Sequence, residues 1–220
     1  MEVFKPNRNM PQPRILLEAG HIYHVWTHAN GSENLFRVEE NYRYFLERYV
    51  HHVHPVVETF AYCLMPNHLH LMIRVREEDE VLEFLRKKKE DPNLQGFQNL
   101  GGFSKVISQQ FSNLFNSYTK AYNNKYDRKG SLFKPNFERK LVNSDEYFAR
   151  LIAYIHNNPV HHGFVENLND WPHSSWQAYL FDKSTKINKE KGFAWFGGKE
   201  NFYKVHRQIN MERLISMFEE

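Results

Sequence analysis

The pattern of apolar positions predicts four β-strands and two helices that alternate along the chain. Strands are predicted at residues 22–27, 56–64, 68–75 and 132–142, where apolar and β-branched residues concentrate. Apolar residues recur at helical spacing from Tyr42 to Val50 and from Ile107 to Tyr122. The order βαββαβ predicts a ferredoxin-like α/β (α+β) sandwich, in which two helices cover one face of an antiparallel sheet. Pro135 places the last strand at an edge or at a bulge.

A third helical pattern follows the last strand and is predicted to cover the other face of the sheet. Asn143 and Ser144 are suited to cap its start, and its buried stripe is formed by Phe148, Leu151, Ile152 and Ile155. Tyr154 lies off this stripe, and Asn158 shares its helix face because it follows four residues later. Pro159 predicts the end of the helix. A simpler interpretation leaves the Tyr154 hydroxyl in water and uses Asn158 as a cap.

The apolar run CLMPNHLHLMI carries His68 and His70 two positions apart. Since strand side chains alternate between faces, both imidazoles project from one face while Leu69 and Leu71 enter a core on the other. Neutral imidazole is the commonest metal ligand, so the pair makes half of a metal site. In a chain with 13 histidines, chance or packing explains such a pair equally well. A phenol and a carboxamide one turn apart on the third helix would complete the arrangement.

Several motifs in order resemble a known protein family. They are AYCLMPNHLHLMIRV, GSLFKPNFERKLV and YIHNNPVHHGFVE, with GHIYHVWTHANGSENLF before them and WPHSSWQAY after them. From about residue 20 to residue 179 the chain resembles the single-tyrosine HUH transposases, in particular the REP-associated tyrosine transposases. FGGKENFYKVH is similar to a tail of some members. The opening loop departs from the basic, glycine-rich family version, because residues 27–30 read THAN, so no DNA contact is assigned to it.

The resemblance implies a transposase that cleaves and rejoins single-stranded DNA. It implies that Tyr154 is the nucleophile, that His68 and His70 are metal ligands, and that Asn158 is a third ligand or a polar neighbour of the metal. The metal would be Mg²⁺ or Mn²⁺ and would polarise and orient the phosphodiester. Tyrosine attack would give a covalent 5′-phosphotyrosine and a free 3′ hydroxyl. Hairpin-forming repeats as target and a homodimer as assembly are implied as well.

Basic and aromatic residues mix before and within the fourth predicted strand. The predicted DNA-binding residues are Arg128, Lys129, Lys134, Arg139 and Lys140, which surround Phe133 and Phe137. Such a mixture suits single-stranded DNA because cations contact the backbone while aromatic rings stack on unpaired bases. Scattered exposed cations are an equally ordinary feature of a protein surface.

Composition agrees with one domain that binds nucleic acid but does not require it. The net charge is +3 with a pI of about 8.8, a mild basic bias. The single cysteine, Cys63, excludes an intrachain disulfide and suits a reducing cytosol, so we expect a cytoplasmic, nucleoid-associated protein. No apolar run of about 18 residues exists, so no membrane partner is expected.

The chain is predicted to divide into an arm, a domain and a tail. Residues 1–19 are expected to form a flexible arm, residues 20–180 the HUH-like domain, and residues 181–220 a linker and helical tail, with a short helix near 209–218. Residues 77–102 are interpreted as a loop insertion, acidic first and then basic. That segment is either a solvated loop or a DNA-guiding patch.

Three other functional classes remain open from the sequence. A non-catalytic DNA-binding module of the same fold would keep the basic surface without cleaving DNA. A Zn²⁺ hydrolase would join the two histidines with a carboxylate and a water. A simple ferredoxin-like interaction domain would use neither the metal nor the tyrosine.

Overall fold

A computed structural model describes residues 14–88, 100–181 and 183–208 of the chain. The helix expected near residues 209–218, most of the predicted arm and residues 89–99 of the predicted insertion lie outside this part. None of the described helices is long and apolar enough to cross a membrane.

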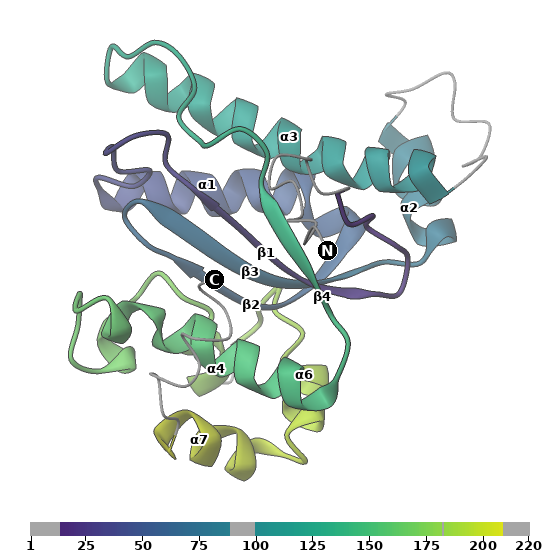
Figure 1. Cartoon of the computed structure of the whole chain (residues 1–220), viewed down its shortest axis with the longest axis vertical. Coiled ribbons are helices and arrows are strands. Elements are labelled where there is room, and N and C mark those ends of the chain that lie inside the picture. The colour runs from purple at the N-terminus through teal and green to yellow at the C-terminus, as the bar shows by residue number, and fades with distance from the viewer. Residues whose placement is uncertain (1–13, 89–99, 182, 209–220) are drawn as a thin grey trace, which may run out of the picture.

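A four-stranded antiparallel sheet organises the fold, as the hydropathy pattern predicts (Figure 1). Its strands are β1 (Ile22–His28), β2 (Val57–Leu64), β3 (His68–Val75) and β4 (Glu138–Val142), in the order β2-β3-β1-β4. Helices α1 (Glu39–His52) and α3 (Leu100–Lys125) cover one face, and α4 (Asp145–His161) covers the other. The predicted α/β (α+β) fold with an additional helix is therefore confirmed.

Each face of the sheet has its own hydrophobic core, because β3 is buried on both sides. Leu69, Leu71 and Ile73 enter the core beneath α1 and α3. Met72, on the alternate face, enters the core beneath α4 together with Leu151. Burial of both faces explains why β3 is a nearly continuous apolar run, broken on the α4 side by His68, His70 and, near its end, Arg74.

Helix α4 begins as predicted but ends later. The Ser144 hydroxyl accepts a hydrogen bond from the backbone N–H of Tyr147 and caps the first turn. The predicted stop at Pro159 is wrong, since Pro159 lies inside a helix that continues to His161. Proline removes only its own N–H donor, and the chain leaves the helix at Gly163, whose φ of 69° lies in the left-handed region.

Strand β4 is shorter than the predicted strand at residues 132–142. Within residues 132–137, the described pairing is an isolated antiparallel bridge between Phe133 and Ala29, which follows β1. Pro135 lacks a donor for a sheet ladder, and Asn136 adopts a left-handed φ of 64°. The residues before β4 therefore form a turn beside the sheet instead of a longer strand.

Two predicted boundaries need correction because the segments concerned pack on the domain. Leu17 of the predicted arm is buried in the α1 and α3 core, and its N–H donates to the Ser104 hydroxyl at 2.8 Å. Within the predicted loop insertion, α2 spans Glu78–Lys88 and buries Val81 and Leu85, and α3 already begins at Leu100.

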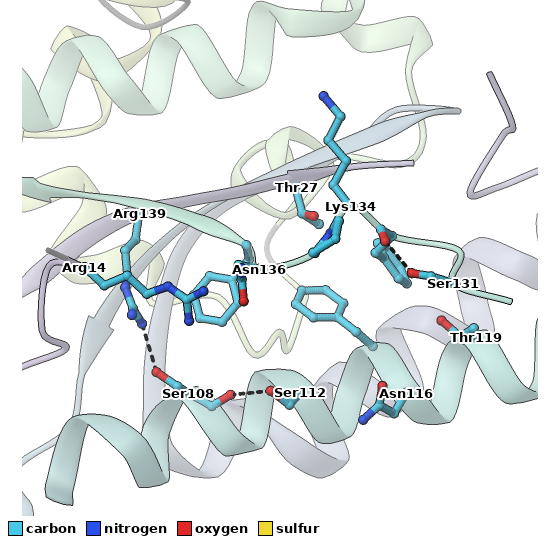
Figure 2. A pocket seen from close by; sticks show the side chains of 14 residues that line it. Arg14, Thr27, Ser108, Ser112, Asn116, Thr119, Ser131, Lys134, Asn136 and Arg139 are labelled. Atoms are coloured by element: carbon cyan, nitrogen blue, oxygen red, sulfur yellow. Dashed lines mark hydrogen bonds between the residues drawn. The ribbon is translucent and has the colours of Figure 1, made fainter. Parts of the chain in front are cut away.

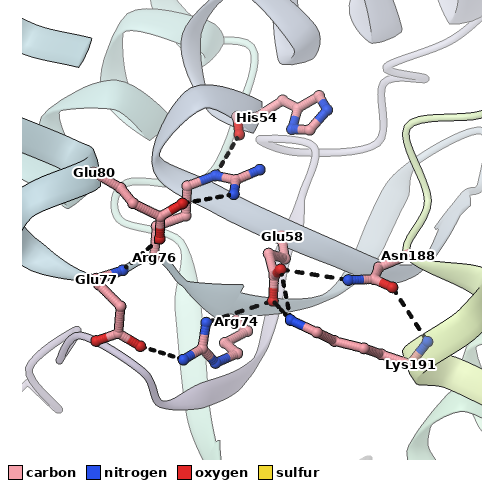
Figure 3. A network of polar contacts seen from close by, with 8 residues as sticks. All are labelled: His54, Glu58, Arg74, Arg76, Glu77, Glu80, Asn188 and Lys191. Atoms are coloured by element: carbon pink, nitrogen blue, oxygen red, sulfur yellow. Dashed lines mark hydrogen bonds and ion pairs between the residues drawn. The ribbon is translucent and has the colours of Figure 1, made fainter. Parts of the chain in front are cut away.

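The tail is ordered earlier than predicted. It contains α6 (Lys189–Trp195) and α7 (Lys199–Gln208), and α5 (Trp176–Leu180) lies just before it. Elsewhere in the described chain, short 3-10 helices span His54–Val56 and Leu168–Asp170. The stretch interpreted as a linker makes a parallel bridge from Ile187 to Thr59 at the edge of β2. Glu58 of β2 forms an ion pair with Lys191 of α6 at 2.8 Å, and Arg74 of β3 lies 3.5 Å from the same carboxylate (Figure 3). These contacts dock the tail on the sheet.

Candidate active site

His68 and His70 lie side by side on the β3 face that α4 covers. Their ring centroids are 5.2 Å apart with the ring planes at 85°, and each residue is 5% exposed. The alternation of strand side chains puts them on this face, as predicted. They leave the α1 and α3 core, but they are buried between the sheet and α4 instead of projecting into solvent.

Helix α4 brings Tyr154 and Asn158 onto the histidine pair. The Asn158 Oδ1 atom lies 3.0 Å from Nε2 of His68. The Tyr154 ring meets the His70 ring edge-on, with centroids 5.5 Å apart. Both α4 residues are completely buried, so Tyr154 is not half-buried with its hydroxyl in water, as the simpler interpretation expected. The structure thus brings the four residues singled out from the sequence together.

Three further histidines surround this group, and the sequence reasoning missed them. On β1, His28 pairs directly with His68 across the sheet and stacks on its ring at 5.0 Å. His24 Nε2 lies 2.9 Å from His70 Nδ1. His162, just beyond α4, meets His68 at 5.0 Å. The spacing of His24 and His28 carried a signal, since residues four apart on a strand share one face.

Both ring nitrogens of His68 face an amide oxygen, so one of these two contacts brings two acceptor atoms together. Its Nδ1 contacts Asn67 Oδ1 at 2.8 Å and its Nε2 contacts Asn158 Oδ1 at 3.0 Å. A neutral imidazole has one N–H, so it can donate to only one of these oxygens. If Nδ1–H donates to Asn67, the lone pairs of Nε2 and Asn158 Oδ1 converge. The Asn158 Nδ2 atom is buried without a hydrogen-bond partner in the described chain.

The site histidines are held neutral by their surroundings. Burial lowers the pKa of His68 to about 4, against the opposing effect of its hydrogen bond with Asn158. Burial also lowers the pKa of His24 to about 3, and Lys140 adds to this shift. The pKa of His70 is well below its ordinary value, mainly through burial and then through His24 and His68. At neutral pH all three rings therefore offer lone pairs.

The donor set fits a divalent cation that takes part of its coordination from elsewhere. Nε2 of His68 faces the Asn158 oxygen, the His70 ring lies beside the His68 ring, and the Asn67 and His24 contacts can fix the tautomers of His68 and His70, as partners of metal-bound histidines do. No group of three or more His, Cys, Asp or Glu side chains in the described residues could hold a metal. A site made only of such ligands, including the Zn²⁺ hydrolase arrangement, is therefore not present in that part of the chain.

The five predicted DNA-binding residues do not form one surface. Arg128 is occupied within the protein, because its Nε donates to both carboxylate oxygens of Glu33 and its other nitrogens donate to Asn123 and to the backbone carbonyls of Gly130 and Ser131. Lys129 next to it is exposed. Arg128 therefore fixes the loop after α3, and Lys129 remains accessible.

The other three cations lie on and before β4. Arg139 pairs across the sheet with Val25 and faces the α3 side, whereas Lys140 pairs with His24 and faces the Tyr154 side. Lys134 and Arg139 line a pocket of about 380 Å³ between α3 and the turn before β4 (Figure 2). The Lys134 side chain extends away from α3.

Comparison with known proteins agrees with the resemblance seen in the motifs. A Haemophilus influenzae relative that carries the name REP-associated tyrosine transposase is 29% identical over 126 residues. The matched region is 56% of this chain and 61% of that relative, so this chain spans less than two thirds of the relative's length. No protein-family profile matches the chain.

A solved structure has the same fold. It is described as a REP-associated tyrosine transposase bound to a REP hairpin, and it superposes with a TM-score of 0.56 at 17% identity. The match covers 78% of this chain and 86% of that one, and at this identity it establishes the fold alone. The resemblance predicted from the sequence motifs is confirmed by the relative and by the fold of this structure.

Proposed function

We propose that this chain, which resembles the REP-associated tyrosine transposases, is a metal-dependent transposase that cleaves and rejoins single-stranded DNA at hairpin-forming repeats. The observation that carries the proposal is the meeting of Tyr154 and Asn158 of α4 with the neutral His68 and His70 pair of β3. In this arrangement the phenol can serve as a nucleophile, and the two imidazoles with the amide oxygen can hold a cation that orients a phosphodiester.

Tyr154 acts as the nucleophile in this proposal. Its hydroxyl oxygen gives up its proton and attacks the scissile phosphorus, the bond from phosphorus to the 3′ oxygen breaks, and the leaving oxygen takes up a proton as a 3′ hydroxyl, so no net proton is consumed. The phosphotyrosine so formed conserves the bond energy, so attack by a 3′ hydroxyl on the same phosphorus reverses the step and joins strands. With one such tyrosine per chain, two linked cleavages need two chains or repeated use of one.

His68, His70 and Asn158 would hold the cation, Mg²⁺ or Mn²⁺, with water or a DNA phosphate oxygen completing the ligand set. When bound, the cation supplies Lewis acidity and orients the phosphodiester. Because all three protein ligands are neutral, the phosphate of the DNA provides the opposing charge. Metal binding is therefore coupled to DNA binding.

Complete burial of Tyr154 sets a condition on this chemistry. A phosphodiester cannot reach a phenol that is enclosed between α4 and the sheet, so the α4 side of the site must open for cleavage. The same burial favours a second candidate function, a non-catalytic module of this fold that binds DNA and uses Tyr154 only for packing.

DNA and a second copy of the chain are the partners in the proposal. The DNA is a single strand that contains a hairpin, as in the named hairpin complex of the structural neighbour. A homodimer would supply the second tyrosine for a linked pair of cleavages.

A covalent-adduct assay separates the two candidate functions. Hairpin DNA with single-stranded flanks from repeats beside the gene is incubated with Mn²⁺ and the full chain, and an adduct that resists SDS is expected. Tyr154→Phe should abolish the adduct and keep DNA binding. Tyr147→Phe, a matched change two turns earlier on α4, should keep both. An adduct of undiminished yield in Tyr154→Phe would contradict the assignment.

A further inference from the structure

The pocket between α3 and the turn before β4 (Figure 2) lies on the α3 side of the sheet, whereas Tyr154 belongs to α4 on the other side (Figure 1). Thr27 of β1 lines the pocket, and Thr27 alternates with His28, which faces the candidate active site. Its volume of about 380 Å³ is within the range of small-ligand sites. None of its described lining residues is acidic, whereas Arg14, Lys134 and Arg139 are cationic.

One face of α3 supplies a row of small polar groups to the pocket. Ser108, Ser112, Asn116 and Thr119 line it at intervals of four, four and three residues, so they follow one side of the helix. The row runs beside the apolar stripe of α3 that enters the core. Within the described chain, Asn116 and Thr119 have no side-chain hydrogen bond, so their donors and acceptors are available to a ligand.

Aromatic rings and guanidinium groups complete the lining. Phe115 and Phe137 are both partly exposed, with ring centroids 6.0 Å apart. Arg139 lies over the Phe137 ring at 5.1 Å and donates to the Ser108 hydroxyl at 2.8 Å. Burial and then the neighbouring Arg14 lower the pKa of Arg139, which Tyr23 and Glu138 oppose. This combination suits a nucleotide, because the cationic side chains can contact its phosphate and the aromatic rings can stack on its base.

Strand β4 offers a short route from this pocket to the active site. It is an edge strand, and its consecutive residues Arg139 and Lys140 point to opposite faces of the sheet. Arg139 faces the pocket, and Lys140 lies on the face of His24 and Tyr154. A single strand that crosses the β4 edge can contact both cations with neighbouring phosphates.

We propose that this pocket binds one unpaired nucleotide of the DNA strand that Tyr154 cleaves, with the base against Phe115 and Phe137 and its edge facing Ser112, Asn116 and Thr119. The inference rests on the proposed function and adds a specificity pocket on the opposite sheet face. Arg14 and Arg139 contact the phosphates of the bound nucleotide, and the strand passes over β4 towards Tyr154.

An abasic scan tests the pocket without requiring cleavage. The probe is the hairpin oligonucleotide described above, with each flanking nucleotide in turn replaced by an abasic site. Affinity for Tyr154→Phe protein is measured with Mn²⁺ present. One position should lose roughly tenfold in affinity, the size of a lost base-stacking contact. Asn116→Trp, which fills the pocket, should weaken the intact probe by a similar factor and remove the penalty at that position.

Asn113→Trp is the matched control, since Asn113 lies on α3 outside the pocket and accepts a hydrogen bond from Gln109. It should behave like the parent. Equal abasic penalties in Asn116→Trp and Asn113→Trp at every position would overturn the pocket, whatever the adduct assay shows. Coupling between Asn116 and one position would uphold it even if no adduct forms. Failure of the parent to bind the probe would overturn both proposals.

Discussion

His24 on β1 places its Nε2 atom 2.9 Å from the Nδ1 atom of His70 on β3. Both rings are buried and neutral, so one nitrogen of the pair donates and the other accepts. If His70 donates, its Nε2 lone pair is directed away from His24 and is available to a metal. His24 would then be a positioning residue that holds the tautomer of a ligand.

Removal of this contact should weaken metal binding more than it weakens the fold. His24→Asn is expected to raise the Mn²⁺ concentration for half-maximal adduct formation roughly 10- to 100-fold, the usual loss for such partners. A Mn²⁺ titration of adduct yield measures this, and saturating metal should restore the yield. His21→Asn, at an exposed position just before β1, is the control. A lower maximal yield at an unchanged midpoint would contradict the positioning role.

The two predicted metal ligands should be individually necessary. His68→Ala and His70→Ala should each abolish adduct formation at any Mn²⁺ concentration, and chelation should do the same to the parent. Asn158→Ala should reduce the rate less, because water can replace a neutral amide oxygen. Since both histidines are buried, circular dichroism must first show that the variants fold. A folded His68→Ala protein that cleaves at the parental rate would exclude the metal proposal.

Sequence patterns located the strands well where burial and alternation coincide. The prediction for β3 has the observed limits because both of its faces are buried and its ends are marked by a turn and by charge. Helix and strand periodicity placed Tyr154 with Asn158 and His68 with His70 on common faces, and the family resemblance indicated that the two pairs meet. His24 and His162 were missed because their proximity depends on strand register and on how α4 extends past Pro159, which no local pattern encodes.

Packing between distant segments is a further feature that local sequence patterns do not reveal. Arg128 has the sequence surroundings of a DNA-binding cation, but its partner Glu33 lies 95 residues away. The tail has a polar sequence, yet Phe202 and His206 are four residues apart on α7 and are both buried. Phe202 packs against Tyr179, with ring centroids 4.5 Å apart. Such contacts override the local composition that suggested a linker.

Stability should fall in mild acid because buried histidines must become protonated on unfolding. Burial lowers the pKa of His206 to about 4 from 6.5, although its hydrogen bond to the Phe202 carbonyl opposes the shift. A lowered folded-state pKa contributes stability that is complete above pH 6.5 and is lost as pH falls towards 4. For His206 alone the loss amounts to about 3 kcal/mol.

Denaturant unfolding measured from roughly pH 7.5 to pH 4 tests this effect, because that range covers both the ordinary and the lowered pKa of His206. His206→Gln should reduce the pH dependence, although it also loses the 2.9 Å contact with His156. His21→Gln should keep the parental profile. If the free energy of unfolding of the parent is constant across this range, the pKa values of the buried histidines are not lowered in the folded protein.

DNA affinity should depend on the cations on and just before β4 and not on Arg128. Lys134→Ala and Arg139→Ala should each weaken binding and reduce the salt slope by about 0.7 for each lost phosphate contact. A salt titration with the hairpin probe, compared with a blunt duplex of the same sequence, gives both slopes. Arg128→Ala should instead lower Tm, because it leaves Glu33 without the Nε–H donor that both of its carboxylate oxygens share. An unchanged Tm with a reduced slope would return Arg128 to the DNA surface.

The parallel bridge from Ile187 to Thr59 has a consequence for assembly. Together with the antiparallel bridge from Cys63 to Ser174, it covers part of the outer side of β2, whereas no strand among the described residues pairs with the outer side of β4. A dimer made by joining two sheets would have to use β4, and so would a strand passing from the α3 pocket to Tyr154. The two arrangements are mutually exclusive at one margin. A homodimer that cleaves DNA by the proposed route must therefore form its interface through helices or the tail. The outer side of β4 then stays accessible to the DNA strand.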